Sequence, residues 1–295
     1  MRAFFGEGRK DTKILSRLSS AAARLIAKLP LRLLHALGSV LGWAAYGMSP
    51  TYRARMKQHL AQAGLHDART RREAIAAAGR LVAETPALWF RPHAEVAQLV
   101  REASGLEEVL AARAAGKALV LLSPHLGCFE VLPQYVALHM PITVLYRRPK
   151  LAWLEPLMRA GRARANVRLA PADLAGVRVL MAALRRGEAV GFLPDQVPGR
   201  GEGEWAQFFG RPAYTMTLAA KLAEREAVAC FLGYARRLPR GAGYAIVVRP
   251  LPPAAPGERP ARRVNRALEA LVRECPGQYL WSYNRYKAPA GAPPP

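Results

Sequence analysis

The sequence has few cysteines, and those it has are far apart. Cys128, Cys230 and Cys275 are the only three in 295 residues, and they form none of the spacings that zinc sites or redox-active pairs use. A reduced cytoplasmic environment is therefore expected, in which Cys128 packs as a small apolar side chain rather than reacting. The chain also lacks the glycine pattern of a phosphate-binding loop and any internal repeat. We expect neither a metal site nor a bound redox cofactor.

Long uninterrupted apolar runs are missing as well. Leu29–Met48 is apolar except for Arg32 and His35, and its clean part, 36–48, is shorter than the roughly 20 residues that span a bilayer. The run starts late, contains a charge and is followed by no persuasive cleavage site, which argues against a secretory signal.

The residues before this run are basic and amphipathic. Over 1–28, lysines and arginines alternate with leucines at helical spacing, as in helices that lie on a membrane surface. We expect residues 1–49 to form an uncleaved membrane anchor, inserted shallowly with Trp43 and Tyr46 at headgroup depth. A membrane-spanning anchor and an ordinary core helix are the alternatives that the sequence leaves open.

Acidic residues are scarce relative to basic ones. The chain has 21 Asp and Glu against 44 Lys and Arg, a formal net charge of +23, which indicates a negatively charged partner. Nucleic acid, an anionic membrane and an acidic carrier protein all qualify. The basic residues are spread along the chain without a recognised nucleic-acid-binding motif, so we expect no nucleic acid partner.

The most informative stretch is KALVLLSPHLGCFEVLPQ, residues 117–134. The apolar run Ala118–Leu122 predicts a strand buried on both faces of an α/β sheet. His125 would then lie on the turn and Glu130 one turn into the following helix, where its carboxylate could orient the imidazole and stabilise the imidazolium. Alone the pair is weak evidence, since a histidine followed five residues later by an acid is expected about 0.4 times by chance.

The rest of the chain predicts one α/β domain with a mixed, mostly parallel sheet flanked by helices. Residues 50–112 are expected to be a helical segment packed on that sheet, 113–287 the catalytic domain, and 288–295 a disordered tail. Further strands are expected over 142–148, 189–194, 228–235 and 244–249, and helices over 151–164, 172–186, 214–225 and 259–273.

Several blocks in a fixed order give the chain a wider likeness. After the His125 stretch come TVLYRRPK (143–150), GRARAN (161–166), GFLPDQ (191–196), FFGRPAYT (208–215) and PGQYLWSYNRYK (276–287). With the histidine and the glutamate, these blocks resemble the lipid A late acyltransferases, within the His-x4-Asp/Glu glycerolipid acyltransferases. The chain departs from that family at His59-Leu60, where an Asn-Leu is usual, so we assign His59 no role and expect it on the surface.

The resemblance implies site residues. His125 would be the general base and Glu130 its partner, while the substrate-binding residues would be Arg159, Arg162, Arg164, Asp195 and Gln196. The arginines cluster at a helix end and suit phosphate, although a solvated helix face is the plain alternative. Asp195-Gln196 follow a buried strand, where α/β sheets place ligands, so Asp195 could position substrate or support His125. Phe208 and Phe209 would wall an acyl pocket or belong to the core.

The resemblance also implies a reaction. A membrane-bound enzyme at the cytoplasmic face of the inner membrane would move a fatty acyl group from acyl carrier protein, or from acyl-CoA, to a hydroxyl of a phosphorylated glycolipid of the lipid A precursor type. No metal or cofactor is expected. A lysophospholipid or another lipid hydroxyl as acceptor is the nearest alternative, and a non-catalytic scaffold or a nucleic-acid-binding protein are the others.

Overall fold

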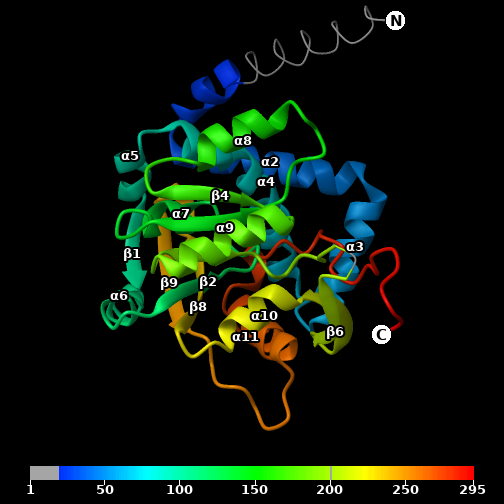
Figure 1. Cartoon of the computed structure of the whole chain (residues 1–295). Coiled ribbons are helices and arrows are strands. Elements are labelled where there is room, and N and C mark those ends of the chain that lie inside the picture. Colours follow the sequence, from blue (N-terminus) through cyan, green and yellow to red (C-terminus); the bar gives the residue numbers. More distant parts are fainter. Residues whose placement is uncertain (1–19, 200) are drawn as a thin grey trace, which may run out of the picture.

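The computed structural model describes residues 20–199 and 201–295, so most of the basic segment expected over 1–28 lies outside it (Figure 1). The α-helices are α2 (Leu31–Met48), α3 (Pro50–Gln62), α4 (Ala68–Phe90), α5 (His93–Gln98), α6 (Leu106–Ala114), α7 (Val131–Val136), α8 (Leu154–Arg162), α9 (Leu174–Arg185), α10 (Thr217–Ala223) and α11 (Pro260–Glu274). The strands are β1 (Val100–Ser104), β2 (Ala118–Leu122), β3 (Ile142–Tyr146), β4 (Val167–Pro171), β5 (Ala189–Phe192), β6 (Gly203–Phe208), β7 (Arg211–Met216), β8 (Val228–Arg237) and β9 (Tyr244–Pro250).

A seven-stranded sheet in the order β1-β9-β8-β2-β5-β3-β4 forms the centre of the fold. Strands β8, β2, β5, β3 and β4 run parallel, while β9 pairs with β8 in the antiparallel sense and with β1 in parallel. The expected mixed, mostly parallel α/β sheet is therefore confirmed. β2 and β5 are neighbours at its centre, so their carboxyl ends open at one edge, where such sheets place ligands.

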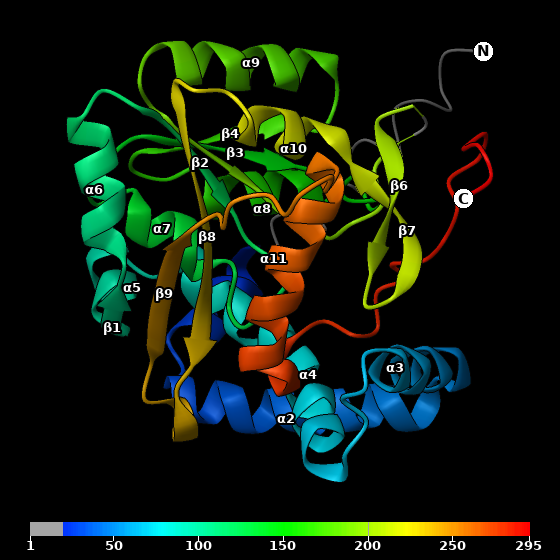
Figure 2. The same ribbon diagram turned by 90° about the horizontal axis from the view of Figure 1, so that it is seen from below.

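Helices cover both faces of this sheet. Figure 2 shows α9 and α10 on one side and α7 on the other. Alternate strand residues point to opposite faces: Val120 and Val190 join the core under α9, α10 and α11, while Leu119 and Leu121 join the core under α5, α6, α7 and α8. Continuous apolar runs such as ALVLL are what a strand buried on both faces requires.

Some elements differ from the sequence expectation. The segment 50–112 also supplies β1, an edge strand whose largely exposed residues carry no apolar alternation. Tyr214 belongs to strand β7 rather than to the following helix, because β6 and β7 form an antiparallel hairpin across the turn at Phe209-Gly210. The hairpin packs on α11 and stands apart from the main sheet in Figure 2.

Helix α2 is docked closely on α4. A Cβ atom on Gly79 would lie 1.9 Å from the carbonyl oxygen of Gly38 and 2.4 Å from the amide nitrogen of Gly42, so the two backbones touch only because these residues are glycines. No helix among the described residues is long and apolar enough to cross a membrane. Within the expected anchor 1–49, residues 31–48 form α2, a helix packed on α4.

A buried carboxylate fixes α2 and α4 to the sheet. Glu84 of α4 is fully buried and accepts hydrogen bonds from His35 of α2 at 2.8 Å, from Arg237 of β8 at 2.9 Å and from the hydroxyl of Tyr244 of β9 at 3.0 Å. Burial alone would raise the pKa of Glu84, but the charge of Arg237 and the hydrogen bonds lower it to about 2. Glu84 is therefore a permanent anion that joins four elements.

We expect the Glu84→Gln substitution to lower the free energy of unfolding at pH 7 by about 3 to 5 kcal/mol, because Arg237 keeps its buried charge and loses its partner. A carboxyl whose folded pKa is depressed stabilises the protein above its unfolded pKa, and that stability is lost as the pH falls towards the folded value. The difference between the two proteins in urea denaturation should therefore shrink below pH 4.5 towards pH 2.

Glu188→Gln is the matched control. Glu188 pairs with Arg168 and Arg186, whose side chains are half exposed, and such pairs contribute about 1 kcal/mol or less. A Glu84→Gln variant as stable as Glu188→Gln, or a difference that does not change with pH, would show that the buried carboxylate does not have this role.

Candidate active site

His125 lies just beyond the carboxyl end of β2, beside the end of β5. The amide of Ser123 still donates to the carbonyl of Phe192 at 2.9 Å, and Pro124 then turns the chain away from the sheet. Asp195 follows β5 and accepts two hydrogen bonds from His125, one from the backbone amide to Oδ2 and one from Nδ1 to Oδ1, each at 2.8 Å. The carboxylate therefore fixes both the backbone and the ring of the histidine.

The second ring nitrogen of His125 faces Gln196. The Nε2 atom of the Gln196 amide lies 3.0 Å from Nε2 of the ring. A carboxylate only accepts hydrogen bonds, so Nδ1 carries the proton, and Nε2 of the neutral ring is the acceptor for the amide. This is the tautomer in which Nε2 can take a proton from a hydroxyl group.

Asp195 is itself supported by the C-terminal block. Burial would raise the pKa of Asp195, but the charge and hydrogen bonds of His125, together with the charge of Arg285, hold it below its usual value. Arg285 is 2% exposed and donates to the carbonyl of Tyr214 and the hydroxyl of Thr215, both at 2.7 Å. Tyr279 lies against Asp195, and burial and that negative charge raise its pKa well above the usual value.

Glu130 does not contact His125, and the expectation that it orients the ring is corrected here. The chain after His125 does not enter a helix: Leu126 and Gly127 form isolated bridges with Tyr279 and Ala235. A Cβ atom on Gly127 would lie 2.0 Å from the carbonyl of Ala235, and its φ is +60°, so glycine alone fits there. α7 begins only at Val131, and Glu130 precedes it.

Glu130 has a different set of partners. Its carboxylate accepts from the indole of Trp89 at 3.0 Å and from Nε of Arg162 at 2.9 Å, with a second bond from the Arg162 guanidinium. The guanidinium carbon of Arg162 lies 5.6 Å from the centre of the Trp89 ring. Glu130 is 5% exposed, so its main structural role is to hold Arg162 at the side of the site.

An open cavity lies in front of these groups. It has an empty volume of about 750 Å³ including open solvent and contains both His125 and Arg162. Arg147, which follows β3, also lines it and gives a second guanidinium there. The remaining lining residues are Phe129, Leu145, Tyr146, Met158, Ala172, Leu193, Gln196 and Met216. The cavity therefore joins a basic nitrogen, two cations and an apolar wall.

Two of the expected phosphate ligands serve other partners. Arg164 donates to the carbonyls of Leu88, at 2.5 Å, and of Arg91, at the end of α4, which satisfies acceptors that a helix terminus leaves free. Arg159 donates to the hydroxyl of Tyr146 at 3.2 Å. Neither lines the cavity with His125, so of the three arginines only Arg162 reaches the site.

The expected acyl-pocket walls and the expected surface histidine are core residues. Phe208 and Phe209 are 2% and 5% exposed and pack against Tyr279 and Trp281 rather than lining the cavity. His59 is 5% exposed, and its Nδ1 lies 2.7 Å from the carbonyl of Trp281. All three hold the C-terminal block that supports Asp195.

Sequence reasoning missed Arg147, Tyr279 and Arg285 as parts of the site. Arg147 stands in the TVLYRRPK block directly after a strand, and the position after a parallel strand was a usable signal. Arg285 and Tyr279 act through Asp195 from 84 or more positions away. Only the fold shows that proximity.

Comparison with known proteins identifies the family. The family model described as bacterial lipid A biosynthesis acyltransferase matches residues 8–288. The chain is similar to the lipid A biosynthesis lauroyltransferase of Escherichia coli (strain K12), 27% identical over 71% of this chain and 69% of that protein. It is also 27% identical to the palmitoleoyltransferase of the same organism, over 75% of this chain and 74% of that protein.

A third relative is the lipid A biosynthesis acyltransferase of Haemophilus influenzae (strain ATCC 51907 / DSM 11121 / KW20 / Rd), 27% identical over 60% of this chain and 56% of that protein. Proteins of this family use no cofactor, and no group of three or more metal-ligating side chains occurs in the described part of the chain. With its family model matched over nearly the whole length, the chain belongs to the bacterial lipid A biosynthesis acyltransferases.

Proposed function

We propose that this protein is a membrane-bound O-acyltransferase that moves a fatty acyl group from an acyl carrier protein thioester to a hydroxyl of a phosphorylated glycolipid of the lipid A precursor type. The observation that carries the proposal is the His125–Asp195 pair, since His125 lines a cavity that also holds cations and an apolar wall. The family to which the chain belongs supports the same reaction.

The geometry supports a general-base mechanism. Nε2 of His125 takes the proton of the acceptor hydroxyl as that oxygen attacks the thioester carbonyl carbon, while Asp195 holds Nδ1–H and stabilises the imidazolium. The tetrahedral intermediate then collapses and expels the carrier thiolate, which recovers the proton from Nε2. The side-chain amide of Gln196, which is hydrogen-bonded to Nε2, marks the position that the acceptor hydroxyl takes.

Arg162 is the proposed ligand of an acceptor phosphate. Its side chain is 24% exposed and lines the cavity, while Glu130 fixes its position from behind. A guanidinium has five donors in a planar fork, so the same side chain can bond to the carboxylate and to a phosphate oxygen. Arg147, which also lines the cavity, is a second candidate ligand for the phosphate.

Charge supports the proposed donor and membrane. The surplus of 44 basic over 21 acidic residues favours association with an acidic carrier protein and with anionic lipid. Helix α2 presents one apolar face to solvent, with Leu33, Leu37, Val40, Leu41, Trp43 and Met48 between 44% and 78% exposed. A contiguous exposed apolar face is typical of an interaction surface, and we propose that α2 lies in the membrane interface at the cytoplasmic side of the inner membrane.

The dyad generates a kinetic prediction. We expect His125→Ala to abolish most acyl transfer from acyl carrier protein to a lipid A precursor. Asp195→Asn should lower kcat about 10²- to 10⁴-fold, because the imidazole is no longer held in the tautomer with the proton on Nδ1 and the imidazolium loses its counter-charge. The double variant should be scarcely worse than His125→Ala alone, since the two residues act as one unit. A folded His125→Ala protein that transfers acyl groups at near the wild-type rate would exclude this mechanism.

Arg162 and Glu130 form a second coupled pair. On a phosphorylated acceptor, Arg162→Ala should lower kcat/KM by a factor that corresponds to a loss of about 1.5 to 3 kcal/mol of transition-state stabilisation. The loss should be much smaller on the same acceptor after enzymatic removal of its phosphate. Glu130→Gln in the Arg162→Ala background should add little further loss, since the carboxylate acts by holding the guanidinium. Arg164→Ala is the control for the arginine cluster and should cost stability without this acceptor dependence. Equal losses on both acceptors would count against a phosphate-binding role of Arg162.

Membrane association is tested with anionic liposomes at physiological salt. We expect Leu37→Glu combined with Leu41→Glu to abolish binding, because two charges on the exposed face of α2 oppose its burial in the interface. Leu110→Glu, at a comparably exposed leucine on α6, should leave binding intact, and melting temperatures should stay similar in all three proteins. Unchanged binding of the α2 variant would place the membrane contact elsewhere.

A further inference from the structure

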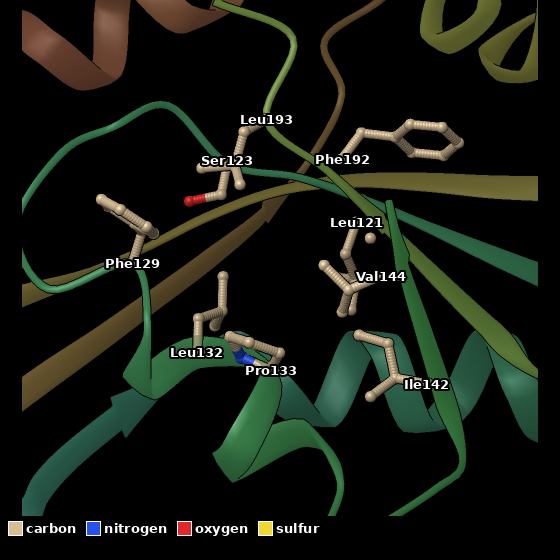
Figure 3. A pocket seen from close by; sticks show the side chains of 10 residues that line it. Leu121, Ser123, Phe129, Leu132, Pro133, Ile142, Val144, Phe192 and Leu193 are labelled. Atoms are coloured by element: carbon tan, nitrogen blue, oxygen red, sulfur yellow. The ribbon is translucent and has the colours of Figure 1, made fainter. Parts of the chain in front are cut away.

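An apolar slot lies between α7 and the sheet (Figure 3). Phe129 and Leu193 line both this slot and the cavity that holds the histidine, and the ring centroids of Phe129 and His125 are 4.7 Å apart. Leu132 and Pro133 of α7 form one wall, and the strands β2, β5 and β3 form the other. The mouth of the slot is therefore next to the base.

The slot exists because one position on this face of the sheet is a glycine, whose lack of a side chain leaves the space open. Leu121 of β2, Gly191 of β5 and Val144 of β3 are register partners in a single row across three adjacent strands. All three face α7, and the middle position of the row has no side chain. The row is two residues nearer to the His125 end of the sheet than Ile142, which lines the far end of the slot.

The backbone does not require glycine at position 191. Its φ is not in the left-handed region, and glycine weakens a strand interior relative to other residues. A Cβ atom there would meet Val144 at 3.4 Å and Ile142 at 3.5 Å, which is ordinary van der Waals contact. An alanine would thus fit the fold, and it would take space only from the slot.

We propose that this slot binds the fatty acyl chain that is transferred, and that Gly191 and Ile142 set the length of chain it accepts. The proposal rests on the proposed function and names its acyl-binding site, in place of Phe208 and Phe209. With the thioester carbonyl at His125, the chain enters past Phe129 and Leu193, passes over Gly191 and ends against Ile142. The lining is almost entirely apolar, as burial of a hydrocarbon chain requires.

The test is a chain-length profile of kcat/KM with acyl carrier protein thioesters of even-numbered saturated chains. Gly191→Ala should shift the preferred donor to a shorter chain. The kcat/KM for the longest chain that the wild type uses well, divided by the kcat/KM for a chain two carbons shorter, should fall roughly 10-fold or more in Gly191→Ala and further in Gly191→Val. Ile142→Val removes the methyl group that ends the slot and should shift the profile towards longer chains.

Val190→Ile is the matched control. It adds a methylene group to the same strand, but on the opposite face, so the chain-length profile should stay that of the wild type. If Gly191→Ala and Ile142→Val lower activity equally for all donors, residue 191 is structural and the proposal is wrong. Because Ile142→Val is a mild core change, it decides the matter even if the Gly191 variants do not fold.

A binding measurement separates this proposal from the proposed function. Native mass spectrometry with free saturated fatty acids reports occupancy of the slot without catalysis. The longest acid retained should be shorter for Gly191→Ala than for the wild type. If the wild type transfers no acyl group but this shift is observed, the slot does bind acyl chains and the proposed reaction is wrong. If transfer occurs and neither profile nor binding depends on residue 191, the slot assignment fails alone.

Discussion

Asp195 holds His125 at two points, and the arrangement of the site follows from that. A single hydrogen bond to the ring would leave the histidine free to move with its loop, whereas the second bond, to the backbone amide, ties the loop after β2 to the loop after β5. The two strands are adjacent and parallel, so the carboxylate and imidazole meet only because the sheet aligns their carboxyl ends. Burial alone would raise the pKa of Asp195, but the charge and hydrogen bonds of His125, together with the charge of Arg285, lower it and keep the carboxylate ionised, which is the state that orients an imidazole.

Two other buried carboxylates hold the helical layer in place around this pair. Glu84 joins α2 and α4 to β8 and β9 through Arg237, and Glu130 joins the start of α7 to α4 and α8 through Trp89 and Arg162. Each carboxylate is matched with a guanidinium, as a buried charge must be. Helix α4 takes part in both, so the helix under the proposed membrane face also supports the side of the site that holds Arg162. The cavity and the apolar slot lie between these fixed points.

The sequence was a good guide to the elements with strong apolar patterns. ALVLL and AVGF are continuous apolar runs of the kind that strands buried on both faces have, and the segment after Arg259 has the period of an amphipathic helix; the structure confirms all three elements. Strand β1 is largely exposed and β4 is partly exposed, so their apolar patterns are indistinct. The site was foreseen in its residue types more than in its pairings. Glu130 was linked to His125 by counting along a helix, but the bridges made by Leu126 and Gly127 keep that helix from forming, and partners 70 positions away cannot be read from local spacing.

The identity of the carboxylate that orients His125 is the central claim, and NMR of the imidazole ring tests it most directly. In the protein labelled with ¹⁵N at its histidines, the Nδ1 proton of His125, assigned by its loss in His125→Gln, should appear at low field because it is bonded to a carboxylate. The signal should persist in Glu130→Gln and be shifted or lost in Asp195→Asn. A signal that survives in Asp195→Asn and disappears in Glu130→Gln would contradict the account.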